Sequence, residues 1–246
     1  SPYADWVDPG MSATLVVDAV DLPAAGGEWL DRWRAADRRL GAALRDLLAR
    51  QPVLTGPAIA EAVCAGLDAD DVLVAGSSQP IRDLDLAPIR PDSPVVYANR
   101  GLAGIDGTVS TALGVALASR RPTHALLGDL TLLHDMPGLL VAPGEPRPDL
   151  RLVVANDDGG SIFASLEHGA PERRDSFERL FGTPQGVDLA HLAAATGWAY
   201  RRAETAAAVG AALAAPPVGL ELVEAVVDRA GRRALAEEIA ALADLV

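Results

Sequence analysis

The chain has 246 residues, which is enough for one or two domains with a buried core. Half of the residues are hydrophobic and 22% are charged, so a disordered or low-complexity protein is excluded. The formal net charge is −13, and an acidic protein repels the phosphate backbone, which argues against general nucleic-acid binding.

The single cysteine, Cys64, cannot form a disulfide within the chain, which is typical of a reducing compartment. The sequence contains no apolar run long enough to span a bilayer, and its first residues do not follow the basic-then-apolar pattern of a signal peptide. We therefore expect a cytoplasmic protein without a membrane span.

Residues 1–27 differ from the rest of the chain. One short strand is predicted over residues 14–17, between segments that contain proline and glycine. Because a lone strand cannot bury itself, we interpret residues 1–27 as the tail of a preceding domain. Residues 28–246 then form the second domain.

The second domain alternates helical and strand patterns. Apolar residues at helical spacing predict helices over residues 28–50, 56–67, 108–119, 188–196, 205–214 and 229–245. Short β-rich runs predict strands at residues 72–75, 95–97, 124–127 and 152–155 and within 220–227. Strands that are apolar throughout and alternate with helices predict an α/β fold, in which a parallel sheet has helices on both faces. The charged run 171–179 is expected to be an exposed loop.

Unusual polar segments follow four of these strands, at residues 76–82, 99–107, 128–131 and 156–160. In an open α/β sheet, ligands bind beyond the carboxyl ends of the strands. These four segments meet along one edge if the sheet is parallel. Together they offer carboxylates, hydroxyls, backbone amides and two arginines, and they predict a binding site there.

Asp129 and Asp157 each lie one residue beyond a predicted strand. Carboxylates are preferred ligands of Mg²⁺, and a backbone carbonyl at Gly159 would add a third oxygen where glycine permits a close approach. Leu130 and Thr131 begin a helix or turn, where free backbone amides favour a diphosphate. The alternative is that both aspartates are N-caps of helices. The pair together with the glycine turn favours a metal site.

This arrangement resembles a known signature. Gly128-Asp129-Leu130, separated by 25 intervening residues from Asn156-Asp157-Asp158-Gly159, is similar to the Gly-Asp-Gly and Asn-Asn motifs of thiamine diphosphate-dependent enzymes. Leu130 replaces the last glycine and Asp157 replaces the second asparagine, although aspartate is still an oxygen ligand. Residues 78–82, 99–107, 156–163 and 182–188 also resemble the menaquinone-biosynthesis synthases of this group, in their actinobacterial branch.

The resemblance implies a thiamine diphosphate-binding fold and a decarboxylating transfer that joins 2-oxoglutarate to isochorismate. Family enzymes are homodimers or homotetramers with an N-terminal pyrimidine-binding domain, a middle domain and a C-terminal diphosphate-binding domain. This chain matches the C-terminal domain. The activating glutamate belongs to the pyrimidine-binding domain, so the resemblance implies that this chain carries no catalytic residue and is inactive in isolation. The implied cofactors are thiamine diphosphate and Mg²⁺, with Mn²⁺ as a substitute.

The resemblance also implies roles for individual residues. The metal ligands are Asp129, Asp157 and Gly159. The cofactor-binding residues are Ser78, Gln79, Gly104, Ile105, Gly128, Leu130, Thr131, Asn156, Gly160, Ile162 and Phe163. The substrate-binding residues are Ser78, Arg82 and Arg100, because the planar guanidinium fork suits a carboxylate. Ile105 would hold the cofactor in its bent conformation.

Several alternatives remain open. Arg82 could pair with Asp83 or Asp85 at the surface, and the apolar residues Ile105, Ile162 and Phe163 could be ordinary core. The chain could belong to another thiamine diphosphate enzyme of the acetolactate synthase or 2-oxo acid decarboxylase type, although Leu130 and Arg100 count against this. It could also be a non-catalytic α/β binding module.

Overall fold

A computed structural model describes residues 12, 14, 15, 17, 19, 21, 27–99 and 104–245. The chain divides into two compact units, residues 1–38 and 39–246. The strand predicted over residues 14–17 is not seen, since Thr14, Leu15 and Val17 lie outside any strand and Val16 is outside the described residues. The domain boundary expected after residue 27 stays a prediction.

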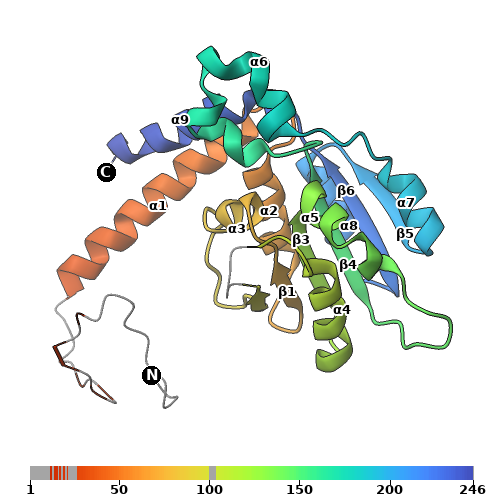
Figure 1. Ribbon diagram of the computed structural model, residues 1–246. Helices are drawn as coiled ribbons and strands as arrows, with labels where there is room; N and C mark the ends of the chain where they lie inside the picture. The colour runs from red at the N-terminus through yellow and green to blue at the C-terminus, as the bar shows by residue number, and fades with distance from the viewer. Residues whose placement is uncertain are drawn as a thin grey trace. The chain divides into compact units, whose positions relative to one another are not determined.

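The second unit contains a parallel sheet in the order β2-β1-β3-β4-β6-β5 (Figure 1). Its strands are β1 (Val72–Ala75), β2 (Val95–Ala98), β3 (Thr123–Gly128), β4 (Leu150–Asn156), β5 (Ala199–Ala203) and β6 (Leu220–Val226). Every neighbouring pair is parallel. The predicted α/β fold with a parallel sheet is therefore confirmed.

Both faces of the sheet are covered by helices. Val74, Leu127 and Leu152 pack in one buried cluster with residues of α4 (Thr108–Ser119) and α7 (Leu189–Thr196). Their strand neighbours Leu73, Leu126 and Val153 point to the opposite face and pack with α2 (Gly56–Gly66) and α8 (Ala206–Leu213). Burial on both faces explains why the central strands are mostly apolar instead of alternating between apolar and polar residues.

The remaining helical elements are short, apart from α1 (Gly27–Ala49) and α9 (Arg232–Ala241). They are α3 (Gln79–Leu84), α5 (Asp129–His134), η1 (Met136–Leu139), η2 (Ser161–Ser165), η3 (Glu167–Gly169), η4 (Pro171–Arg173), α6 (Arg174–Phe177), η5 (Glu178–Gly182), η6 (Arg229–Gly231) and η7 (Leu242–Leu245). The helix predicted over residues 229–245 is therefore interrupted: Gly231 is the N-cap of α9, and a 3₁₀ turn stands at either end of that helix.

Two further expectations are wrong. The run 171–179 is exposed as expected, except for Phe177, but it is helical and not a loop; the buried ring of Phe177 anchors it. Strand β5 is absent from the sequence-based prediction. It is an edge strand with two exposed arginines, Arg201 and Arg202, so it shows no apolar run.

Cys64 is a free, half-buried thiol, and its burial raises its pKa, which makes it a weak nucleophile. In the described part of the chain, no helix is long and apolar enough to cross a membrane.

Candidate functional site

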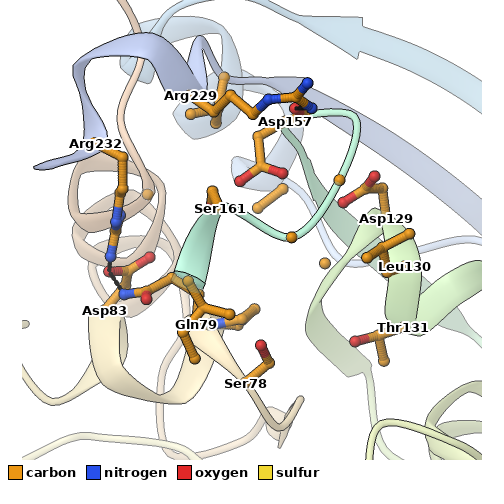
Figure 2. Close-up of a pocket in the computed structure, with 18 of the residues that line it drawn as sticks. Ser78, Gln79, Asp83, Asp129, Leu130, Thr131, Asp157, Ser161, Arg229 and Arg232 are labelled. Atoms are coloured by element: carbon orange, nitrogen blue, oxygen red, sulfur yellow. Dashed lines mark hydrogen bonds and ion pairs between the residues drawn. The ribbon is translucent and has the colours of Figure 1, made fainter. Parts of the chain in front are cut away.

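A cavity of about 340 Å³ lies at the carboxyl ends of the strands (Figure 2). The structure brings most of the predicted site residues together around it. Those that line it are Ser78, Gln79, Arg82, Ile105, Gly128, Asp129, Leu130, Thr131, Asp157, Gly159, Gly160, Ile162 and Phe163. They come from the segments that follow β1, β2, β3 and β4, as the parallel topology requires.

The two predicted metal ligands come from neighbouring strands. Asp129 is the first residue of α5 and is 5% exposed, and Asp157 follows β4. Neither is an N-cap: Gly128 holds that position for α5 and Gly160 holds it for η2, so the capping alternative does not describe them. Burial raises the pKa of Asp129 to about 7, and the negative charge of Asp157 contributes to the rise.

The environment of the Asp157 carboxyl group also disfavours its ionised form. Burial raises its pKa, against a lowering effect from the Ser161 hydroxyl. Its Oδ1 atom is buried and has no hydrogen-bond partner among the described residues. The backbone amide of Gly159 lies close enough to lower the pKa of both carboxyl groups. A divalent cation between the two carboxylates would offset the cost of burying both charges.

The donors suit a hard cation. Within the described residues no cluster of three or more His, Cys, Asp or Glu side chains could hold a metal. Two carboxylates are nevertheless enough for Mg²⁺, which usually keeps water and phosphate oxygens as its other ligands. The residues present therefore fit a cation that is shared with a bound phosphate group.

The loop after β4 is packed tightly against η5. A Cβ atom on Gly159, whose φ is +148°, would come within 2.1 Å of the Gly182 carbonyl oxygen. The Gly160 amide donates to that same oxygen at 2.7 Å. Glycine is therefore required at residue 159 by a backbone contact, in addition to any approach of a cation.

The opposite wall of the cavity is formed by α3. Ser78 is its N-cap and has a φ of +72°, and the Arg82 guanidinium donates to the Ser78 carbonyl. The carboxylate of Asp83 pairs with Arg232, not with Arg82, at 2.9 Å. The surface pairing of Arg82 with Asp83 is thus not what the structure contains.

From the sequence, three apolar residues could either contact the cofactor or belong to the ordinary core. Ile105, Ile162 and Phe163 all line the cavity, and none is fully buried. Phe163 is 37% exposed and its ring lies 5.7 Å from that of Phe181. They are therefore wall residues of the cavity and not members of the closed core.

Two predicted residues, Asn156 and Gly104, do not line it. The Asn156 amide turns toward β6 and donates to Glu224 at 2.6 Å, while its oxygen accepts from the Asp158 amide at 3.0 Å. Asn156 therefore holds the loop after β4 through its bonds to Glu224 and Asp158, and does not face the cavity. Gly104 is exposed and is not a lining residue, and Arg100 lies outside the described residues.

Sequence reasoning missed a charged group beside the cavity. Asp83 is buried, and its Oδ1 accepts from Arg232 at 2.9 Å and from Gln79 at 2.8 Å. Burial raises the pKa of Asp83 to about 6 although Arg232 opposes the rise. Arg229 also lines the cavity. The sequence does contain a signal for the arginines of this site, because the basic residues 229, 232 and 233 closely follow the last predicted strand.

Comparison with known proteins agrees with this geometry. No protein-family model matches the chain. It is 53% identical over 238 residues to the 2-succinyl-5-enolpyruvyl-6-hydroxy-3-cyclohexene-1-carboxylate synthase of Nocardioides sp., covering 95% of this chain and 44% of that protein. It is 49% identical to the synthase of the same name from Saccharopolyspora erythraea, covering 95% of this chain and 42% of that protein.

The chain is homologous to part of these synthases. The resemblance inferred from the loops is thereby confirmed, and the chain spans less than half the length of these relatives. Among solved structures, benzoylformate decarboxylase from Polynucleobacter necessarius has a similar fold, with a TM-score of 0.54 and 20% identity. That similarity covers 74% of this chain and 34% of the decarboxylase.

Proposed function

We propose that this chain provides the diphosphate- and metal-binding half of a thiamine diphosphate-dependent synthase. The full protein would join 2-oxoglutarate, after its decarboxylation, to isochorismate in menaquinone biosynthesis. The observation that carries the proposal is the buried pair Asp129 and Asp157 at the edge of the cavity, where burial disfavours ionisation of both and the charge of Asp157 adds to this at Asp129. The identity to the synthases over 95% of the chain supports the choice among enzymes of this fold.

The residues of the cavity divide into three roles. The carboxylates of Asp129 and Asp157 and the carbonyl of Gly159 would hold Mg²⁺, or Mn²⁺, which prefers the same oxygen ligands. The backbone amides of Leu130 and Thr131 would bind the diphosphate. Ile105 and the Ile162–Phe163 wall would contact the rings of the cofactor. When bound, thiamine diphosphate supplies the electron sink for loss of carbon dioxide from a 2-oxo acid.

The substrate must be selected by its second carboxylate, because pyruvate offers the same 2-oxo acid group. Arg82 lines the cavity, with Ser78 one helical turn away. We infer that both contact the distal carboxylate of 2-oxoglutarate, together with Arg100. Arg82 is already engaged by the Ser78 carbonyl, so its orientation is set before the substrate arrives.

The second half of the site would come from elsewhere. We propose that a pyrimidine-binding domain supplies the activating glutamate across a subunit interface of a homodimer or homotetramer. This chain on its own would then bind the metal and diphosphate weakly and would not turn over. In this scheme residues 1–27 are the tail of a middle domain.

The test is a calorimetric titration of the full protein that carries this chain with Mg²⁺ and thiamine diphosphate, followed by a turnover assay. We expect cofactor binding that requires the cation, and turnover of 2-oxoglutarate with isochorismate but not of pyruvate. Binding with a preference for pyruvate would favour an acetolactate synthase or decarboxylase. Failure to bind the cofactor would favour a binding module and overturn the proposal.

A substitution sharpens the assignment of substrate. Arg82→Ala should lower kcat/KM for 2-oxoglutarate by about tenfold, because a hydrogen bond to a charged group contributes roughly 1.5–3 kcal/mol and this side chain is only partly shielded from water. Cofactor affinity should not change. If Arg82→Ala weakened cofactor binding and kept the preference for 2-oxoglutarate, its assigned role would be wrong.

A further inference from the structure

Arg229 connects three segments that are far apart in the sequence. It lies in η6, shortly after β6, and its side chain is 20% exposed. Its Nη1 donates to the carbonyl oxygen of Asp157 at 3.0 Å and also to that of Asp158. Its Nη2 pairs with the Glu178 carboxylate at the start of η5. Figure 2 shows the guanidinium reaching over the loop that carries Asp157.

The loop that it holds has a backbone that would not keep its shape unaided. Asp158 has a φ of +53°, which is rare for a residue with a side chain, and Gly159 has a φ of +148°. Such conformations persist where the surroundings enforce them. Here the surroundings are the Arg229 clamp on the two carbonyls and the contact of the Gly160 amide with Gly182.

The clamp also determines which oxygens of the loop remain for a cation. The carbonyls of Asp157 and Asp158 are engaged by the guanidinium. The Asp158 carboxylate is engaged as well, since its Oδ1 accepts from the amides of Gln185 and Gly186 at 3.0 and 2.8 Å. The Asp157 carboxylate, by contrast, keeps a buried Oδ1 that accepts no hydrogen bond from any described residue.

We propose that Arg229 is a positioning residue that holds the loop 156–160 in the shape in which the Asp157 carboxylate faces a cation, and that it ties this loop to η5. The inference rests on the proposed function, since it concerns the same cation. Arg229 needs no contact with substrate or cofactor for this role. Its guanidinium acts through the backbone of the loop.

The chain contains a matched control. Arg90 makes a similar set of bonds at another place: its Nη1 donates to the carbonyls of Cys64 and Ala65 at 2.7 and 3.0 Å, and its Nε and Nη2 bond to the Asp92 carboxylate at 3.0 and 2.6 Å. It is not among the residues that line the cavity. Arg90→Ala therefore removes a comparable clamp without touching the proposed site.

The first measurement is cation affinity in the full protein, by calorimetry with thiamine diphosphate present. Arg229→Ala should weaken Mg²⁺ binding by about 10- to 100-fold, as removal of an outer partner of a metal ligand does. Ca²⁺ tolerates irregular geometry and Mg²⁺ does not, so the ratio of Mg²⁺ to Ca²⁺ affinity should fall. Arg90→Ala should leave both affinities and their ratio unchanged. Arg229→Lys should rescue little, because one ammonium cannot span two carbonyls and a carboxylate.

The second measurement needs no ligand and separates this inference from the proposed function. Amide hydrogen exchange in the cofactor-free protein should become faster in Arg229→Ala for peptides that contain Gly160, Gln185 and Gly186, and not in Arg90→Ala. If the wild-type protein binds no cofactor, the proposed function fails, while the exchange still tests the clamp. Unchanged exchange, or a wild-type Mg²⁺ to Ca²⁺ ratio in Arg229→Ala, overturns the inference.

Discussion

Ionisable groups are buried at both ends of the parallel sheet, but their charges are compensated in different ways. Near the amino ends of the strands, Arg151 is buried and pairs with Glu221 at 2.7 Å, while donating to the Ala215 carbonyl at 2.9 Å. Its neighbour on β3, His124, is neutral, because burial lowers its pKa to about 3 and the charge of Arg151 contributes. At the carboxyl ends, Asp129 and Asp157 are buried beside each other.

This difference distinguishes ionisable residues that stabilise the fold from those that serve a function. At the amino ends each buried charge is compensated by a group of opposite charge or is removed by a pKa shift, so these residues need nothing from outside. At the carboxyl ends two carboxylates are buried beside each other, and the positive charges of Arg229 and Arg232 offset only part of the cost of burying Asp157. Such an arrangement destabilises the protein alone and favours a bound cation, which is typical of functional sites.

The largest expected effect is on binding at the carboxyl ends. Asp157→Ala or Asp129→Ala should weaken cation-dependent cofactor binding by more than about 100-fold, which exceeds the loss seen for outer partners of metal ligands. The same variants should unfold at no lower temperature than the wild type without ligand, because a like-charge pair has been removed. Calorimetry and thermal unfolding measure the two effects.

The aspartate variants have an internal control. Asp188 is an exposed aspartate that caps α7 through the His191 amide, and it is not among the residues that line the cavity. Asp188→Ala should lower stability slightly and leave cofactor binding intact. Unchanged binding in the Asp129 and Asp157 variants would remove the functional contrast between the two ends of the sheet.

The next effect is on stability at the amino ends. Arg151→Ala leaves a partly buried carboxylate without its partner and should lower the free energy of unfolding by about 3–5 kcal/mol. Glu204→Ala removes an exposed pair with Arg202, at 2.9 Å, and should cost about 0–1 kcal/mol. Urea denaturation measures both. A small loss of stability in Arg151→Ala would mean that this buried ion pair contributes no more to stability than a surface pair does.

A pH dependence distinguishes the two ends further. The pKa of Asp129 is about 7 in the folded chain against an ordinary value of 3.8, so the folded state binds the proton more tightly. Its contribution to stability is therefore present below about pH 4 and is lost as the pH rises to about 7, by roughly 4 kcal/mol at most. The quantity to measure is the difference in unfolding free energy between wild type and Asp129→Asn against pH, with divalent cations chelated.

The outcome of that comparison is specific. The carboxamide introduced by Asp129→Asn does not ionise, so the wild type should lose stability relative to the variant across this pH range. Saturating Mg²⁺ and cofactor should abolish the loss. A difference that does not vary with pH would show that Asp129 ionises freely in the folded protein.

The smallest effect is expected at His124. Its Nδ1 is buried without a hydrogen-bond partner in the described residues, and its Nε2 lies 3.8 Å from Asp71, which is too long for a hydrogen bond. His124→Leu should raise the free energy of unfolding by up to about 1 kcal/mol, because an apolar side chain removes an unsatisfied polar group. A clear loss of stability would reveal a polar contact that the imidazole needs.

The sequence alone predicted the elements whose residues carry a clear apolar pattern. The helix expected over residues 108–119 matches α4, and the strand at residues 72–75 matches β1, because local periodicity and burial agree there. Strand β5 escaped prediction since an edge strand pairs through its backbone and leaves its side chains free to be polar. The division at Gly231 escaped because alanine-rich sequence continues the helical pattern past it.

The candidate site shows the same limit. The order of strands and the polar segments after them were enough to bring Asp129, Asp157 and Ser78 to one cavity, because the carboxyl ends of parallel strands share one edge. The direction of each side chain was decided by tertiary contacts. Asn156 turns to Glu224, 68 residues later, and Arg229 clamps the carbonyl of Asp157, 72 residues earlier. Partners so distant in the chain leave no local pattern, so only the folded structure could identify them.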